Sequence, residues 1–471
     1  MKEDLEMKSL EIKALQEHAE AASKEPHVEV TDNGFEFKSK DGNFTAAVNG
    51  RMQVDSQINL NQQVAIATGA STQNQFDDGV AIRRARLGVE GKFFKDWDYK
   101  FEYDFTRGNG TVGAGVTDAF IRWNMDKEFS IKVGSFKEPF SLEEATSNRY
   151  LTFIERNMAV NTFIDNLNTY KVGIGANYWT NDWQTGVSLQ TEPVGQNFNG
   201  ISGNPNSTSP TGSATNFNGG ANRNNGSGDT SWEANVRVSG LPWNEGKTKF
   251  WHVGASGSYM NINNNYLANG TFNNGGIDFV SALNNNVDRT NVLDTGNLTS
   301  GARMGATSKV ANHLTRFGAE TALVYGPWSA QAEYIQTDVS GKGYNHNESL
   351  NGYYAYGSYF LTGESRSYKA KTGAWDRLKP NRNFDMKGGW GAWELAAGYD
   401  YLNLNSGAIA GGQASTAKFG LNWYPNSHVR VMLDYVKTLN IDTQGAAAGT
   451  RVRAFNNADY DMLETRVQLD W

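Results

Sequence analysis

The feature that most constrains this chain is an alternation of apolar and polar side chains that runs to its last residue. From 463 to 471 the odd positions are mainly apolar and end on Trp471, while the even positions hold Glu464, Arg466, Gln468 and Asp470. Because successive side chains of a strand point to opposite faces, this segment has one apolar and one charged face. A two-faced strand that ends on an aromatic residue favours the closing strand of an outer-membrane β-barrel.

The same alternation recurs throughout the chain. It is clearest from Tyr99 to Phe105, where four aromatic residues share one face and Lys100, Glu102 and Asp104 share the other. Such an aromatic face suits lipid and would be a liability in water. Comparable segments lie at 44–59, 81–93, 116–123, 129–136, 170–178, 183–190, 232–239, 250–259, 314–325, 328–336, 352–360, 392–402, 414–423 and 429–436. The sequence therefore predicts an all-β fold, a 16-stranded antiparallel transmembrane β-barrel, since about sixteen strands make an even number.

Composition agrees with this fold and narrows the function. Hydrophobic residues make up only 38% of the chain but aromatic residues 12%, which suits strands that are apolar on one side. The absence of cysteine excludes thiolate metal sites and cysteine nucleophiles, and the net charge of −7 excludes a broadly basic nucleic-acid binder. The histidines lack metal-ligand spacing, and there is no G-x-S-x-G elbow. We expect no metal, no cofactor and no enzymatic activity, with a barrel-embedded enzyme left as an alternative.

Three regions are expected along the chain. Residues 1–25 lack Gly and Pro and favour a helix, in which Leu5, Ile12 and Ala19 recur every seven residues. That pattern allows a trimeric coiled coil or a solvated helical tail. Residues 26–42 are expected to form a linker and residues 43–471 the barrel. A secretory signal is absent from this numbering, so we expect it to begin after cleavage or trimming.

The connections between strands differ in length and composition. Short turns flanked by aromatic residues, at 178–183 and 325–328, are expected on the periplasmic side. The Asn/Gly/Ser-rich stretches 196–229 and 261–312 are expected to be extracellular loops. The segment 137–168 is instead rich in apolar and aromatic residues and should pack somewhere. Folded into the barrel, it would narrow the channel; a lid on the outer rim or a subunit contact are the alternatives.

Charged residues fall on the inward face of several predicted strands. They are Arg51, Arg84, Arg86, Asp118 and Arg122, with Arg83 beside them near a strand end. Burying so many charges without partners in a dry interior would be prohibitive. They predict a water-filled lumen, in which each is a candidate pore-lining residue.

Several motifs resemble the phosphate-selective porin O and P family. They are IRRARL at 82–87, GSFKEPFSLE at 134–143, TFIERN at 152–157, GYY at 352–354 with LTGE at 361–364, GAWEL at 391–395 and NWY at 422–424. The resemblance spans about residues 30 to 471, in the family's order. It implies a sixteen-stranded barrel, a homotrimer, and a third loop folded inward as the constriction.

The resemblance also suggests residues for the constriction. Arg83 and Arg84 match the family's paired wall arginines, and Asp118 matches its pore aspartate. The family's loop lysine corresponds to Glu144, a reversal of charge, and its later arginine ladder is reduced to Arg303. Basic residues persist after 361–364, namely Arg366, Lys369, Lys371, Arg377 and Lys379. An anion filter needs a net positive constriction, so these departures argue against phosphate selectivity but not against a porin.

We therefore predict a passive outer-membrane porin for small ions and hydrophilic solutes, in contact with membrane lipids. Its constriction is expected to combine Arg83, Arg84 and Asp118 on the wall with Lys137, Glu143 and Glu144 from the loop. Arginines facing loop carboxylates would impose a transverse field on the permeating solute. The alternative from another class is a structural barrel that the N-terminal helix tethers within the envelope.

Overall fold

The computed structural model describes most of the chain and almost all of the barrel wall. The described residues are 7–8, 12–14, 16, 27–31, 34–63, 76–106, 115–165, 169–194, 231–262, 265–266, 272–274, 277–285, 287–300, 308–344, 347–446 and 451–471. The loop 196–229 lies outside them. The six described residues within 1–25 are all helical and exposed. No helix in the described part of the chain is long and apolar enough to cross a membrane.

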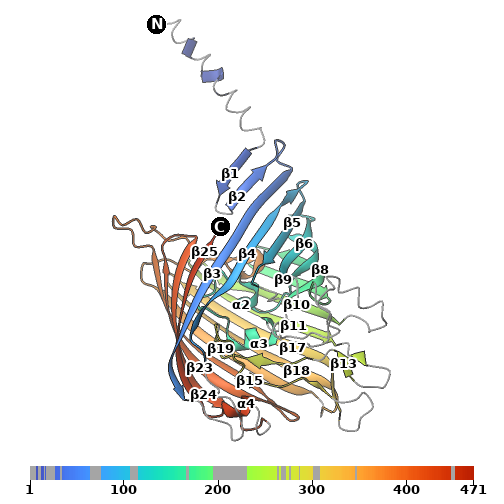
Figure 1. The fold of residues 1–471 in the computed structure, drawn as a ribbon. Coiled ribbons are helices and arrows are strands. Elements are labelled where there is room, and N and C mark those ends of the chain that lie inside the picture. The colour runs from blue at the N-terminus through green and yellow to red at the C-terminus, as the bar shows by residue number, and fades with distance from the viewer. Residues whose placement is uncertain are drawn as a thin grey trace.

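Sixteen antiparallel strands of the described residues form a closed barrel, as predicted (Figure 1). Each pairs with the next, and each predicted segment coincides with one strand. They are β3 (Phe44–Gln63), β4 (Gly79–Phe93), β5 (Trp97–Asp104), β6 (Val116–Asn124), β7 (Phe129–Lys137), β8 (Tyr170–Trp179), β9 (Trp183–Gln190), β10 (Trp232–Asn244), β11 (Lys249–Asn261), β17 (Lys309–Tyr325), β18 (Trp328–Lys342), β19 (Glu348–Phe360), β22 (Ala392–Ser406), β23 (Ile409–Tyr424), β24 (Val429–Asp442) and β25 (Asp459–Asp470).

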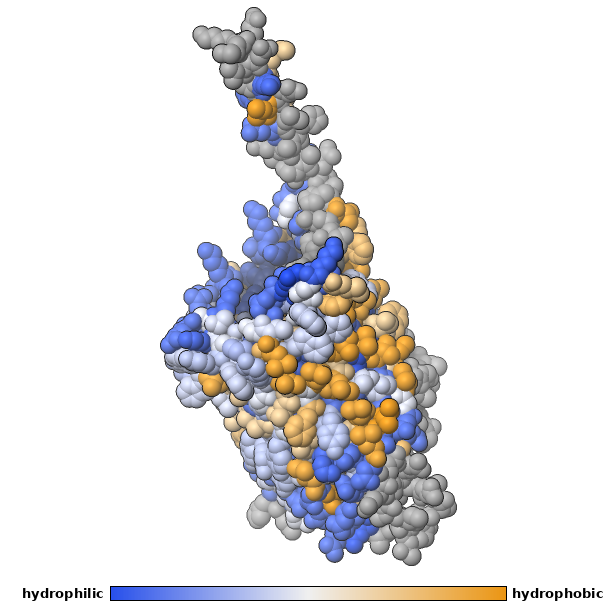
Figure 2. Space-filling view, turned by 90° about the vertical axis from the view of Figure 1, so that its left-hand side faces the viewer, coloured by the Kyte–Doolittle hydropathy of each residue, from blue (hydrophilic) through white to orange (hydrophobic). Residues whose placement is uncertain are grey.

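The first and last barrel strands form the seam. Strand β25 pairs with β3 in a register that places Val467 opposite Val54. Along β25, Val467 is 53% exposed on the outer face, whereas Arg466 is 1% exposed on the inner face. Figure 2 shows hydrophobic residues gathered along the outer wall. The alternation of the sequence is thus the lipid-facing and inward-facing alternation of the barrel.

The segment 26–42, expected to be a linker, instead contains a β-hairpin. Strand β1 (His27–Thr31) pairs with β2 (Gly34–Lys38), and β2 pairs with the start of β3. The pairing partners on β3 are Thr45 to Val48, whereas β25 pairs only from Arg51 onward. The hairpin therefore covers the part of the β3 edge that β25 leaves unpaired. The alternation in these strands is five residues long, too short to predict them from the pattern.

The two ends of the barrel differ. We call the end that holds Trp471 the turn rim and the opposite end the loop rim. Six connections at the turn rim are short, but the one between β19 and β22, residues 361–391, is long. It contains β20 (Tyr368–Lys369), η3 (Ala370–Thr372) and β21 (Ala374–Trp375). We call it the turn-side insert.

Two loops from the loop rim fill much of the lumen. The inward loop, 138–169, joins β7 to β8 and carries α2 (Leu142–Ala145) and α3 (Met158–Phe163). The long loop, 262–308, joins β11 to β17 and carries β12 (Asn265–Tyr266), β13 (Phe272–Asn274), β14 (Val280–Ser281), β15 (Leu293–Asp294) and β16 (Thr299–Ser300). The last loop contains α4 (Arg451–Ala454).

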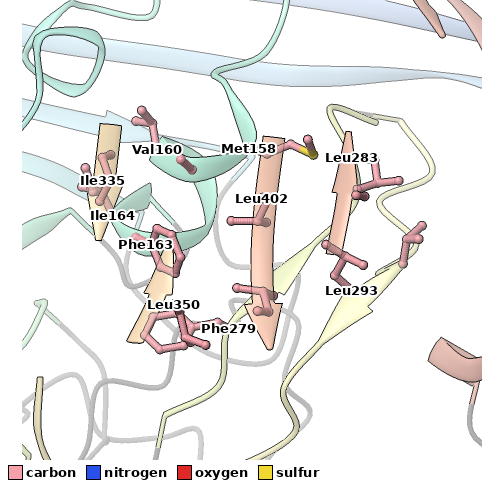
Figure 3. Packing of buried hydrophobic residues seen from close by; sticks show 14 of the residues in the cluster. Met158, Val160, Phe163, Ile164, Phe279, Leu283, Leu293, Ile335, Leu350 and Leu402 are labelled. Atoms are coloured by element: carbon pink, nitrogen blue, oxygen red, sulfur yellow. The ribbon is translucent and has the colours of Figure 1, made fainter. Parts of the chain in front are cut away.

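These loops build an apolar core inside the barrel. Figure 3 shows Phe163 of α3 among Phe279 of the long loop and Leu350 of the wall. Met158, Leu283 and other members of the cluster are less than 2% exposed. Burial of this much apolar surface fixes the loops against β18, β19 and β22. The apolar core therefore lies on the side of the barrel interior formed by β18, β19 and β22.

Candidate functional site

The inward loop crosses the barrel and binds the far wall. Ser141, whose φ is 63°, begins α2, and its hydroxyl accepts a hydrogen bond from the backbone N–H of Glu144. On strand β18, the carboxylate of Glu333 accepts bonds from the backbone N–H groups of Leu142 (3.1 Å) and Glu143 (2.8 Å). A carboxylate at the first turn of a helix satisfies donors that otherwise lack partners. The loop is therefore held inside the barrel, as predicted.

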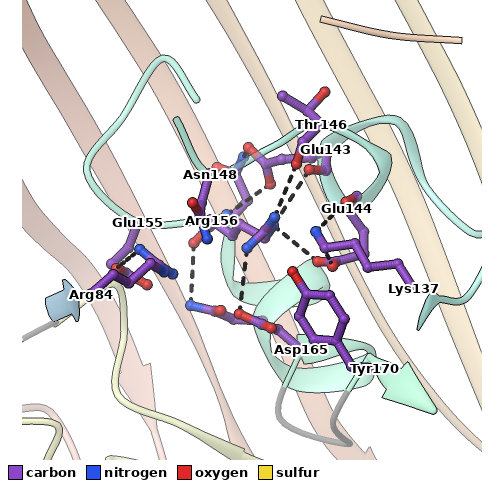
Figure 4. Close-up of polar contacts among 12 residues, drawn as sticks. Arg84, Lys137, Glu143, Glu144, Thr146, Asn148, Glu155, Arg156, Asp165 and Tyr170 are labelled. Carbon is purple, nitrogen blue, oxygen red and sulfur yellow. Dashed lines mark hydrogen bonds and ion pairs between the residues drawn. The ribbon is translucent and has the colours of Figure 1, made fainter. Parts of the chain in front are cut away.

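The predicted loop residues Lys137 and Glu144 bond to each other. Glu144 is fully buried, with its carboxylate 2.7 Å from the Lys137 ammonium and 2.9 Å from the Arg156 guanidinium (Figure 4). Arg156 also lies 3.5 Å from the carboxylate of Asp165. Because Glu144 has two cationic partners, it does not present an unpaired negative charge to the lumen.

Glu143 also points into the loop and not toward the wall arginines. Its carboxylate accepts hydrogen bonds from the backbone N–H of Asn157 (2.9 Å) and from the Asn157 side chain (2.6 Å). Burial raises the pKa of Glu143 above its ordinary value. The carboxylate that faces the wall arginines is instead that of Glu155.

The paired wall arginines bind the tip of the loop. Arg83 forms a two-point ion pair with Glu155, at 2.8 and 3.1 Å, and Arg84 donates to Gln53 at 3.0 Å and lies 3.8 Å from Glu155. Glu155 also lies 3.3 Å from Arg466 on β25. Two-point arginine–carboxylate pairs fix geometry as well as charge.

Arg51 and Arg86 belong to a second buried network on the same wall. Arg51 pairs with Glu102, and Arg86 pairs with Glu102 (2.9 Å) and Asp104 (2.8 Å). The hydroxyl of Tyr170 lies 3.2 Å from the Arg86 guanidinium. Both arginine side chains are buried, and carboxylates balance their charges.

The inward charges nearer the turn rim are more exposed. Asp118 pairs with Lys100 at 2.9 Å, and Arg122 pairs with Asp98 at 2.9 Å, with Arg122 32% exposed. The strand register places four charged residues directly opposite one another across β4 to β7, in the order Lys92, Asp98, Arg122, Lys132. We call these four residues the basic row.

The turn-side insert reaches into the barrel and faces this row. Arg237 of β10 donates to the backbone carbonyls of Thr372 (3.2 Å) and Gly373 (2.7 Å). The indole N–H of Trp375 donates to Gln331 at 2.6 Å, and its backbone N–H donates to Thr146 of the inward loop. The insert therefore contacts both the barrel wall and the inward loop.

The insert carries two lysines close to the basic row. Lys371 lies over the ring of Trp179, with its ammonium 3.9 Å from the ring centroid. Burial and the neighbouring charge of Arg122 lower the pKa of Lys371. Lys369 is exposed at the start of η3, and Lys379 is exposed farther along the insert. Arg303 lies outside the described residues.

Sequence reasoning missed several residues that the structure brings together here. Glu155 and Arg156 lie in the TFIERN motif at 152–157, but no local pattern indicates which carboxylate pairs with a wall arginine. Lys132 alternates with apolar neighbours on a clear strand, so the inward parity of its position could have found it. The sequence also contained a sign that the turn-side insert packs against the barrel, because Tyr368 and Trp375 are aromatic residues in a long polar connection.

Comparisons with known proteins agree with the fold and the motifs. Residues 47–471 match the family model described as phosphate-selective porin O and P. The chain is 26% identical over 420 residues to Porin O of Pseudomonas aeruginosa, covering 86% of each. It is also 26% identical over 450 residues to an uncharacterized protein of Caulobacter vibrioides, covering 94% of this chain and 77% of that protein. A loop L8 deletion mutant of OmpT, an outer membrane protein of Vibrio cholerae, has a similar fold, with a TM-score of 0.51 and 11% identity over 91% of this chain and 100% of that chain.

Proposed function

The chain belongs to the phosphate-selective porin O and P family, and we propose that the channel it forms prefers anions. As a porin of the bacterial outer membrane, it provides a passive, water-filled passage for small ions and hydrophilic solutes. In such barrels the short turns face the periplasm, so the turn rim is the periplasmic end.

The charge around the basic row carries this proposal. The row and the two nearby insert lysines, Lys369 and Lys371, together hold five cationic side chains and one carboxylate, Asp98. Cations focused in a passage raise the local concentration of anions and lower the barrier to their entry. Closer to the loop, wall arginines and carboxylates neutralise one another, so the periplasmic half decides the sign of selectivity.

The passage itself is proposed to run along β4 to β7. Lys100, Arg122 and Lys137 are each more than 20% exposed on this side, whereas the inward charges of β23 to β25 are almost fully buried. The apolar core occupies the opposite side of the lumen. Arg83, Arg84 and Asp118 on the wall and Lys137 on the loop would then border the narrowest part.

The pairing of Glu144 bears on phosphate. Because Glu144 is buried and paired with Lys137 and Arg156, it repels anions far less than an exposed carboxylate would. The same pairing engages the two cations of this region that could otherwise bind phosphate. We therefore propose a preference for anions in general, without a dedicated phosphate site at the loop.

Three further parts of the proposal concern assembly and roles. We propose that the protein is a homotrimer, as the family resemblance implies, and that it has no enzymatic activity. Residues 1–25 would form a helical extension, in which Ile12, on the seven-residue stripe, is an exposed apolar residue suited to packing between three copies. Deletion of residues 1–25 followed by electrophoresis without boiling would show whether the helix holds the trimer together.

Single-channel recording in planar bilayers tests the anion preference. In a KCl gradient, the zero-current potential should have the sign of chloride preference. The double change Lys92→Gln and Lys371→Gln should move it toward zero, while Lys127→Gln, in an exposed turn next to the row, should not. A cation-preferring potential in the unchanged protein would contradict the proposal.

A further inference from the structure

Two lysines beside the proposed passage lie on aromatic rings and lack ionic partners. The ammonium of Lys132 is 4.1 Å from the centroid of the Phe136 ring and 5.8 Å from that of Phe120. The ammonium of Lys371 is 3.9 Å from the centroid of Trp179. Within the described residues, neither ammonium forms a hydrogen bond or an ion pair. Each therefore keeps its charge available to a ligand.

Two of the three rings beside these lysines are partly accessible, whereas Phe136 is buried. Phe120 and Trp179 are half-buried, and the alternation of β6 and β8 points both inward. The residues directly across from Phe120 and Lys132 on the next strands are Gly134 and Gly175, which have no side chains to cover them. Part of the Phe120 and Trp179 ring surface is thus exposed next to these lysines, with the Arg122 guanidinium also over Phe120, 5.9 Å from its ring centroid.

An inorganic anion would use only the cations of this arrangement. A phosphate or chloride ion gains nothing from a phenyl or indole ring, which presents a negative face. An organic anion with a planar apolar group would use both parts. Its anionic group would pair with a lysine, and its planar group would remove ring surface from water.

We propose that the Lys132–Phe120 and Lys371–Trp179 pairs bind organic anions whose charged group is attached to a planar apolar group. This inference rests on the proposed preference for anions and names the solute class that the passage holds best. Arg122 of the basic row lies directly opposite Lys132 across β6 and β7.

Block of the chloride current provides the test. Benzenesulfonate and methanesulfonate are both fully ionised and differ in the ring. The half-blocking concentration of benzenesulfonate should be roughly 3- to 10-fold lower than that of methanesulfonate, the effect of about one aromatic contact. Equal half-blocking concentrations would overturn the inference.

Variants separate ring recognition from simple obstruction by a larger ion. Phe120→Leu keeps an apolar side chain but removes the ring, so the ratio between the two sulfonates should fall toward one. Lys132→Gln should weaken block by both sulfonates, whereas Lys127→Gln should leave both unchanged. A ratio that persists in Phe120→Leu, Trp179→Leu and their combination would mean obstruction only and would overturn the proposed site.

The zero-current potential distinguishes failure of this inference from failure of the proposed function. If the channel prefers chloride but does not discriminate between the sulfonates, only the aromatic site is wrong. If it prefers potassium and neither sulfonate blocks it, the anion preference is wrong as well.

Discussion

The indole of Trp471 lies against the backbone of Gly50, so the last residue of the chain packs on the first barrel strand. The two residues also exchange backbone hydrogen bonds, each 3.1 Å long. A Cβ atom added at Gly50 would overlap the indole ring. Closure of the barrel at the turn rim thus requires a residue without a side chain, Gly50, opposite the indole of Trp471.

The first prediction concerns this contact. Gly50→Ala should displace the indole and destabilise the closed barrel by about 1–3 kcal/mol, the usual cost of overpacking. The fraction of folded, heat-modifiable protein in outer membranes should fall. Gly257→Ala is the matched control, because a Cβ there meets only Val236 at an ordinary 3.6 Å. Equal folded fractions for the two variants would show that the contact does not limit closure.

The second prediction concerns the buried carboxylate of the inward loop. Glu144→Gln would leave Lys137 and Arg156 without their shared partner, at a cost on the order of 3 kcal/mol. Among folded channels, the zero-current potential should move toward stronger anion preference, because the positive charge of Lys137 is no longer balanced by the Glu144 carboxylate. Thermal unfolding and bilayer recording measure the two effects. Glu128→Gln, in an exposed turn, should change neither.

The third prediction concerns the turn-side insert. Arg237→Met removes the hydrogen bonds to Thr372 and Gly373 and leaves Glu320 without its arginine. The insert should then detach from β10, which would raise single-channel conductance and speed tryptic cleavage after Lys369 and Lys371. Arg382→Met, at an exposed position of the same insert, serves as the control. Unchanged conductance and cleavage would mean that other contacts suffice to hold the insert.

The fourth prediction concerns pH. Burial and the nearby carboxylate of Asp294 raise the pKa of Asp278, in the long loop, to about 6. A carboxyl whose pKa is raised by folding stabilises the fold while protonated, so this contribution is full below about pH 4 and is lost as pH rises through 6. Asp278→Asn should therefore stabilise the protein more at pH 8 than at pH 4. Thermal unfolding at both pH values checks this, and an effect independent of pH would contradict it.

Much of the fold could be predicted because the decisive signal is local. Strand parity depends only on neighbouring residues, so Val467 outward and Arg466 inward follow directly from the alternation. The inward loop was also predictable, because apolar residues such as Phe163 need a core.

The pairing inside the lumen could not be predicted in the same way. Glu144 was expected to face the wall arginines, but the turn at Ser141 directs it to Lys137 and Arg156. Such partners depend on the path of a loop and on residues far apart in sequence. Similarly, Leu350 follows the inward parity of its strand, but nothing local shows that two loops cover it with an apolar core.

The bonds between Arg466 and the inward loop have a consequence for the order of assembly. Arg466 on β25 donates to the carbonyl of Ile154 and pairs with Glu155, 311 residues away, as well as with Asp55 across the seam. If the loop had not yet docked, closing the seam would bury this guanidinium with only part of its partners, which is costly. Contacts of such long range form late in folding. The edges of β3 and β25 should therefore stay unpaired until the inward loop is in place. A chain whose inward loop is misplaced would keep these two strand edges exposed.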